Sequence, residues 1–376
     1  MSFRRRFVYL VMNNTQQRDF PLRRIDAARL FFPKGERPPV PPPPPEDARL
    51  PPPAIRFSAP TPTTGTGTGT GTSTSKGAME FMLLHGSSGG GGGGGWRKRH
   101  KVVATDHTGR CVMYDPARGT VRALPELTPA PKVRPAALPV GDDDLYVIDT
   151  HFNRAFSRDA ACFHGLLFDP DAADWDWRPM PPPPYARTYD PDSQRVRAHI
   201  TSYAVAGGGG GASVWVSKDG LGTHSFDVGT GEWAKAGDWV LPFWGPGTYV
   251  PEHKLWFGLL ADKVEDGVVC ASDLTAAPPA APRVLWREES PTPPEWQGRS
   301  TFLVHLGCSR FCLARFFKIV RGGPAGGSPC VSRFAVFSGL EVVTGGHGDG
   351  EGEELRMVKH RSLRYSLVNK LLHWVL

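Results

Sequence analysis

Short apolar segments bounded by turn residues recur along most of the chain. In Cys111–Asp115 and Leu145–Asp149, aliphatic and aromatic residues fill most of five positions, and Gly, Pro or Asp residues lie close by. Segments of this length and composition are typical of β-strands, so their recurrence predicts an all-β fold. Helical spacing of apolar residues is confined to Leu22–Phe32, where we predict a short helix that Pro33 ends.

The segments recur in a fixed order: a strand, a second strand ending in an aromatic residue and Asp, a tight turn, and a third strand. The aromatic residues of this marker are Tyr114, Phe168 and Phe226, spaced by 54 and 58 residues. A kelch blade has roughly 50 residues, and one small sheet must stack on its neighbours to bury its faces. We therefore predict a kelch-like β-propeller of five to seven blades, with six favoured.

Three regions of different composition divide the chain. Residues 1–33 hold the apolar segment Phe7–Met12 and the predicted short helix, residues 34–77 are rich in Pro, Gly and Thr, and residues 78–376 carry the remaining strand-like segments. The middle region has no apolar periodicity, which predicts a disordered or polyproline linker. Propellers usually close by pairing strands from both termini, and Phe7–Met12 and Leu371–Leu376 are suited to that pairing.

The positive charge is concentrated near the N-terminus. The net charge is +7, and residues 1–60 hold eleven Lys and Arg against five Asp and Glu, which leaves +1 for the rest. Because nucleic-acid binding requires a concentrated basic face, we do not expect it of the folded body. No apolar run is long enough to span a membrane, and the six cysteines are scattered. We expect a cytoplasmic or nuclear protein, and the oligomeric state stays open.

Several motifs resemble those of a large plant family expanded in grasses, whose members are uncharacterised proteins with a domain of unknown function. The resembling segments cover nearly the whole chain: Phe7–Val11, Leu22–Asp26, Gly222–Asp227, Glu232–Pro242, Tyr249–Glu252, Leu255–Gly258, Leu355–His360 and Trp374–Leu376. The family is related to kelch and F-box-associated propellers, so the resemblance implies a propeller-like fold and no established activity. Residues 1–50 lack the leucine-rich helical pattern of an F-box, and direct recruitment to a ubiquitin ligase is not expected.

No motif predicts a catalytic, cofactor-binding or metal-binding residue. The glycine runs lack the G-K-[ST] of a phosphate-binding loop. The acidic segment 345–354 and the pair Cys308 and Cys312 are the nearest approaches to a metal site. Neither has the ligand spacing of a known site, so we interpret the first as a solvated hairpin and the second as core thiols.

Two candidate binding features remain. We predict that Trp244 and Trp296 lie in Gly- and Pro-rich loops, outside the positions where other tryptophans recur. Exposed aromatic side chains in loops are good anchors for a protein partner. A basic cluster suited to nuclear import comprises Arg97, Lys98, Arg99 and Lys101. We predict a non-catalytic protein-binding module. The alternative is a propeller enzyme or a carbohydrate- or small-molecule-binding protein with its site at the central channel.

Overall fold

The computed structural model describes residues 5–14, 17–60, 77–86, 99–128, 132, 134–150, 162–186, 199–208, 211–264, 266–276, 278–288, 292–321, 330–345, 354–367 and 373–376. These residues form strands and three short 3-10 helices, η1 (Ala27–Leu30), η2 (Pro184–Ala186) and η3 (Ala261–Lys263). The all-β prediction is confirmed. Within the described part of the chain, no helix has the length and apolar character needed to cross a membrane.

The strands of the described residues group into six antiparallel units of four. Unit 1 combines both ends of the chain: β25 (His373–Val375), β1 (Phe7–Met12), β2 (Phe20–Asp26) and β4 (Pro53–Phe57). Unit 2 contains β5 (Met79–Gly86), β6 (Arg99–Asp106), β7 (Cys111–Asp115) and β8 (Thr120–Leu124). Unit 3 contains β9 (Ala136–Val140), β10 (Asp144–Ile148), β11 (Phe163–Asp169) and β12 (Asp174–Pro179).

Units 4 and 5 share one eight-stranded sheet, because their first strands pair in parallel. Unit 4 contains β13 (Ser202–Gly208), β14 (Gly211–Lys218), β15 (Gly222–Asp227) and β16 (Trp233–Gly237). Unit 5 contains β17 (Phe243–Val250), β18 (Leu255–Leu260), β19 (Val269–Ser272) and β20 (Arg283–Trp286). Unit 6 contains β21 (Gln297–Gly307), β22 (Arg310–Arg321), β23 (Cys330–Gly345) and β24 (Glu354–Leu367), and β3 (Glu46–Ala48) extends it to a five-stranded sheet.

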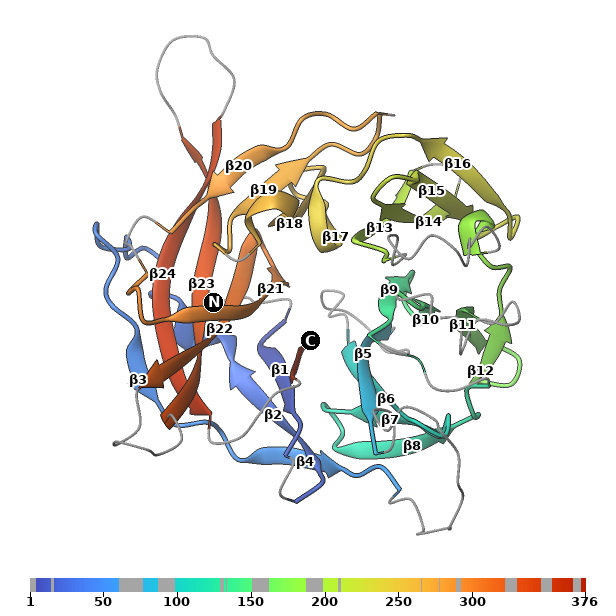
Figure 1. The fold of residues 1–376 in the computed structure, drawn as a ribbon, viewed down its shortest axis with the longest axis horizontal. Coiled ribbons are helices and arrows are strands. Elements are labelled where there is room, and N and C mark those ends of the chain that lie inside the picture. Colours follow the sequence, from blue (N-terminus) through green and yellow to red (C-terminus); the bar gives the residue numbers. More distant parts are fainter. Residues whose placement is uncertain are drawn as a thin grey trace.

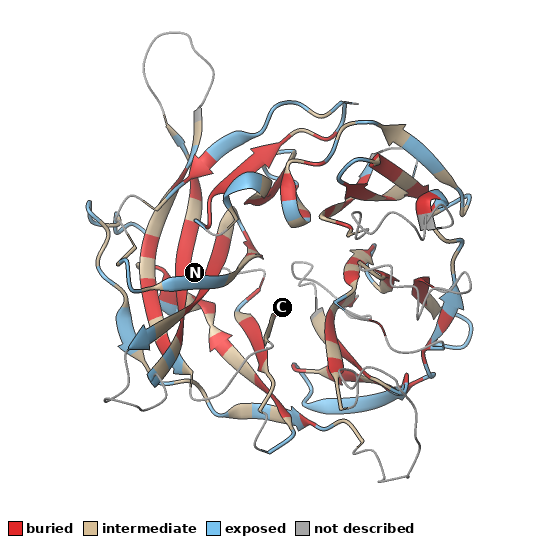
Figure 2. Cartoon of the chain, viewed as in Figure 1, coloured by how far each residue is buried: buried red, intermediate tan, exposed pale blue. Residues whose placement is uncertain are grey.

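The six units surround a common centre, and the first strands of units 2 to 5 lie on their central side (Figure 1). Each unit shares a buried apolar cluster with the next, and the cluster that joins β1 and β2 to β21–β24 connects unit 6 back to unit 1. Buried residues accordingly follow the strands of every unit (Figure 2). A single small sheet exposes both of its faces, so this mutual stacking supplies the core.

The repeated Asp of the sequence has a physical role in the turns. Asp115, Asp169 and Asp227 end the third strands of units 2, 3 and 4, and each carboxylate accepts backbone N–H groups two or three residues further on. Asp273 does the same directly after β19. Such bonds stabilise a tight turn between two strands, which explains the predicted order of segments. The predicted repeat corresponds to strands two to four of units 2 to 5.

The two chain ends pair as the sequence predicts. Leu10, Val11 and Met12 of β1 face Val375, Trp374 and His373 of β25 in antiparallel register. Tyr9 and Leu376 add two reciprocal backbone hydrogen bonds of 2.8 and 2.9 Å. Unit 1 is therefore assembled from residues that lie more than three hundred positions apart.

The linker prediction for residues 34–77 is wrong over two segments. Pro53–Phe57 forms β4 beside β2, and Glu46–Ala48 forms β3 beside β24. Both are edge strands of their sheets. A proline lacks an N–H donor and is tolerated at an edge, where one side of the strand needs no partner, so a proline-rich composition did not exclude a strand. The Gly-Thr repeat, 65–72, lies outside the described residues.

The prediction of a helix over Leu22–Phe32 is wrong for most of this segment. Phe20–Asp26 is strand β2, and only Ala27–Leu30 forms a single 3-10 turn. The Asp26 carboxylate caps this turn by accepting the Ala28 N–H at 3.0 Å. Pairing with β1 buries Leu22 and Ile25 completely, and this tertiary packing overrides a weak helical pattern.

Candidate functional site

The strand β17 changes its hydrogen-bonding partner part-way along its length. Its two ends pair with β18, whereas Gly245–Gly247 pairs in parallel with Ser202–Ala204 of β13. Gly245 has a φ of +73°, a left-handed conformation that glycine adopts without steric cost, and the register against β18 shifts here. The Gly-Pro-Gly segment is therefore a bulge inside a strand. The sequence-based placement of Trp244 in a loop is wrong.

Two glycines make room for the ring of Phe243 next to this bulge. Phe243 is fully buried, and a Cβ added at Gly247 or Gly258 would lie 2.6 Å from one of its ring carbons. Only glycine allows so close an approach at both positions. Because successive side chains of a strand point to opposite faces, burial of Phe243 directs Trp244 outward.

Strand β17 and the residues before it carry three exposed apolar side chains. Trp244 is 49% exposed and Tyr249 is 41% exposed, and Val240 just before the strand is 43% exposed. Among the large apolar side chains of the described residues, no other aromatic one is exposed. The Tyr249 ring lies 4.6 Å from the buried ring of Trp256, which supports it from below. We call the exposed residues Val240, Trp244 and Tyr249 the β17 surface. Trp244 pairs with Leu259 and Tyr249 pairs with Trp256, so the two rings lie on opposite faces of the sheet.

Trp296 has a different environment. It lies directly before β21 and is half-buried, with its ring 5.2 Å from that of Phe317 and 4.6 Å from that of Phe334. These contacts belong to a small apolar cluster on β22 and β23. The two tryptophans singled out in the sequence thus lie in different sheets against different neighbours.

The predicted nuclear-import cluster is only partly described. Arg97 and Lys98 lie outside the described residues, as does the side chain of Arg99, whose backbone starts β6. The Nζ atom of Lys101 lies 3.8 Å from Asp143 Oδ1 and 4.1 Å from the centre of the Trp175 ring. Burial lowers the pKa of Lys101. This lysine connects units 2 and 3 rather than standing free on the surface.

Glu80 on β5 accepts two hydrogen bonds from neighbouring segments of the chain. Its Oε2 accepts the indole N–H of Trp374 at 3.0 Å, and its Oε1 accepts the backbone N–H of Arg134 at 3.1 Å. Burial raises the pKa of Glu80 to about 7, because desolvation disfavours the carboxylate more than these bonds favour it. One side chain thereby joins β25, β5 and the segment entering β9.

His373 on β25 is held in a similar way. Its Nε2 lies 2.6 Å from Ser300 Oγ, and its ring stacks on Phe316 with the centroids 3.7 Å apart. Burial lowers the pKa of His373 to about 4, so the ring is neutral at pH 7. Glu80 and His373 are thus bonded to protein groups, which is the arrangement expected of groups that join neighbouring units.

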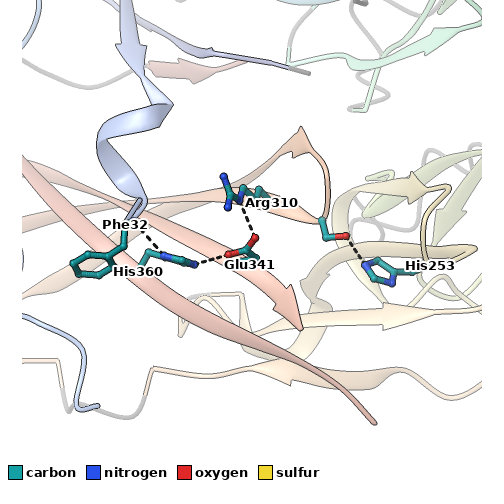
Figure 3. A network of polar contacts seen from close by, with 6 residues as sticks. Phe32, His253, Arg310, Glu341 and His360 are labelled. Carbon is teal, nitrogen blue, oxygen red and sulfur yellow. Dashed lines mark hydrogen bonds and ion pairs between the residues drawn. The ribbon is translucent and has the colours of Figure 1, made fainter. Parts of the chain in front are cut away.

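A second polar network connects the N-terminal segment to unit 6 (Figure 3). His360 Nε2 lies 2.8 Å from Glu341 Oε2, and its Nδ1 accepts the Phe32 N–H at 3.4 Å. Arg310 Nε donates to Glu341 Oε1 at 2.9 Å. The bond from His360, followed by that from Arg310, lowers the pKa of Glu341. A carboxylate held ionised between two donors stabilises packing and is a poor proton shuttle near neutral pH.

The same view shows a link between units 5 and 6 (Figure 3). His253 lies in the turn between β17 and β18, and its Nε2 is 2.9 Å from the hydroxyl of Ser309 in the turn before β22. A serine next to a histidine can be a nucleophile, but no third group that orients this imidazole is among the described hydrogen bonds. We interpret this pair as a hydrogen bond that joins the two turns.

Cys308 and Cys312, which are close in the sequence, have different environments in the structure. Cys312 is buried in β22, whereas Cys308 is exposed in the preceding turn with a φ of +52°. Among the described residues, no group of three His, Cys, Asp or Glu side chains is placed to hold a metal ion. Most of the acidic segment 345–354 lies outside the described residues.

Comparison with known proteins identifies the family. A family model described as a protein of unknown function, DUF1668, matches residues 5–365. The chain belongs to the DUF1668 family. No curated protein matches this DUF1668 chain. A solved structure of a structural genomics protein of unknown function from Bacteroides thetaiotaomicron is similar at 11% identity and a TM-score of 0.35, covering 69% of this chain and 62% of that one.

Two of the three residues of the β17 surface in this DUF1668 chain, Val240 and Tyr249, were not predicted from the sequence. Tyr249 lies five positions after Trp244, on the other side of the bulge, where β17 pairs with β18 again. The Gly-Pro-Gly string between the two aromatic residues was the available signal. Glycine inside a strand pattern often marks a bulge.

Proposed function

We propose that this DUF1668 protein is a non-catalytic, kelch-like propeller of six blades that binds a protein partner through the β17 surface. Three features support the six-bladed architecture: six four-stranded units, apolar clusters between all consecutive units, and a unit built from both chain ends. A composite unit built from both chain ends links the last unit to the first and gives a rigid support for binding.

The exposure of Trp244 and Tyr249 on one strand is the observation that carries the proposal. Exposed aromatic surface is unfavourable in water, and on folded proteins it can mark an interaction site. Tryptophan and tyrosine contribute strongly to binding when a partner removes them from water. The bulge and the buried Phe243 hold both rings on a structured element, so little order has to be gained on binding.

Proximity labelling in the native tissue tests this function. The full-length protein is compared with the double variant Trp244→Ala and Tyr249→Ala, and with the control Val284→Ala. Val284 is 40% exposed but lies on β20, the last strand of unit 5. We expect a defined set of proteins that the control retains and the double variant loses. Identical sets from all three would contradict binding through the β17 surface.

A further inference from the structure

Unit 4 buries a lysine that has no acidic partner. Lys218, the last residue of β14, is only 6% exposed, and no described ion pair or hydrogen bond engages its ammonium group. Its one described contact is with the ring of Tyr185, whose centre lies 5.6 Å from Nζ. Its ammonium nitrogen is not among the fully buried unpaired polar atoms of the described residues, so it keeps some contact with water. A cation–π contact compensates only a small part of the hydration that it has lost.

A histidine completes the cluster. His224 on β15 is 8% exposed, its ring lies 5.0 Å from that of Tyr185, and its buried Nδ1 has no hydrogen-bond partner. Tyr185 belongs to η2, the connection between units 3 and 4, and is itself 7% exposed. Lys218 and His224 thus both lie next to the ring of Tyr185 at the boundary between two units.

The charge of this cluster is unbalanced. Desolvation lowers the pKa of both Lys218 and His224, and the charge of Lys235 lowers that of His224 further. Lys235 is paired with Asp238, whose side chain is exposed and whose backbone lies against Gly222 of β15. Natural proteins rarely bury a charge without a partner, whereas an anion would satisfy both Lys218 and the imidazole.

We propose that Lys218, Tyr185 and His224 form a binding site for a small oxyanion, a carboxylate or phosphate group, which is separate from the β17 surface. The ammonium group would pair with the anion, while the imidazole and the phenol would donate hydrogen bonds to its oxygens. Lys218 and His224 retain only a small exposed fraction, so the site admits a compact group and not an extended chain. Metabolites that carry such a group are the class of ligand that it would select.

Thermal unfolding of the full-length protein tests this site. Melting temperatures are measured in sodium chloride, inorganic phosphate and acetate at equal ionic strength, for wild type, Lys218→Met and the control Lys263→Met. Lys263 is an exposed lysine of η3, so its variant reports the general effects of salt and of losing one charge. A response to phosphate alone or to acetate alone identifies which oxyanion the site prefers.

We expect phosphate or acetate to raise the melting temperature of wild type and of Lys263→Met. The dissociation constant of the anion should be at least tenfold larger for Lys218→Met. In chloride alone, Lys218→Met should melt at a higher temperature than wild type, because methionine fills the same space without a buried charge. An equal response of all three proteins to the anions would overturn the proposal. So would a lower melting temperature of Lys218→Met in chloride, which would make Lys218 a structural residue.

Discussion

Units 5 and 6 carry tryptophans in similar Gly- and Pro-rich sequence surroundings and place them in opposite environments. In unit 5, a buried Phe243 occupies the inner side of β17, and Trp244 faces outward. In unit 6, Trp296 covers Phe317 and Phe334, and a network around Glu341 ties the sheet to the N-terminal segment. The same residue type is therefore exposed in one unit and packed against the sheet in the other.

The cause of this difference is the direction in which each backbone presents its side chain. The bulge of β17 fixes which residues face the core, and Phe243 fills the available space. The segment before β21 instead brings Trp296 back over its own sheet. Four measurements test this difference between the two units. They are given in order of the expected change in the free energy of unfolding, from the largest to the smallest.

The largest effect is expected from Trp296→Ala. Removing a half-buried indole that contacts two rings should lower the free energy of unfolding by about 2–4 kcal/mol, since large-to-small core substitutions cost this much. Chemical denaturation measures the change, and Trp296→Phe should recover part of it. An alanine variant as stable as wild type would show that Trp296 is not a packing residue.

Gly258→Ala should have the next largest effect. The new Cβ would lie 2.6 Å from the Phe243 ring, and relieving such overpacking typically costs about 1–3 kcal/mol. Because the ring supports β17, this variant should also weaken partner binding although Gly258 is not on the β17 surface. Unchanged stability and unchanged labelling would show that Phe243 does not set the geometry of β17.

Glu341→Gln should reduce stability in a way that depends on pH. The native pKa of Glu341 is lowered, so its ionised form stabilises the fold above the ordinary carboxyl pKa, and this contribution is lost as the pH falls through the native pKa. We expect the variant to be about 1 kcal/mol less stable at pH 7 and similar to wild type at pH 3. The same difference at both pH values would contradict an ionised Glu341 in the network.

The smallest change in stability is expected from Trp244→Ala. An exposed side chain contributes little to folding, so unfolding should change by less than about 0.5 kcal/mol. Loss of an aromatic anchor should nevertheless weaken partner binding by at least about tenfold, as for other interface hot spots. A strongly destabilised variant would show that Trp244, like Trp296, is a packing residue.

Several elements of this fold could be predicted from local sequence. Strands two to four of units 2 to 5 carry a marker, because the Asp that ends each third strand closes a turn through its own carboxylate. The pairing of β1 with β25 could be predicted from two apolar terminal segments. Both signals depend on residues whose chemistry acts within a few positions or at a chain end.

Other features depend on contacts that sequence alone does not reveal. The first strands β9 and β13 carry Ala with Pro or Gly and lack the marker. Strand β13 pairs with β17 of the next unit, a contact between segments far apart in the sequence. The roles of Trp244 and Trp296 depend on distant residues, Gly258 for the first and Phe334 for the second. Lys218 ends an ordinary strand pattern, and only the fold shows that it lacks a counterion.

Site-specific photo-crosslinking tests the central claim most directly. A photoreactive phenylalanine derivative is placed at position 249 on the β17 surface or, as a control, at position 284 on β20, in full-length protein with Trp244 intact. Binding through the β17 surface predicts one or a few discrete crosslinked proteins from position 249 and none of these from position 284. No discrete product from position 249, or the same products from both positions, would contradict it.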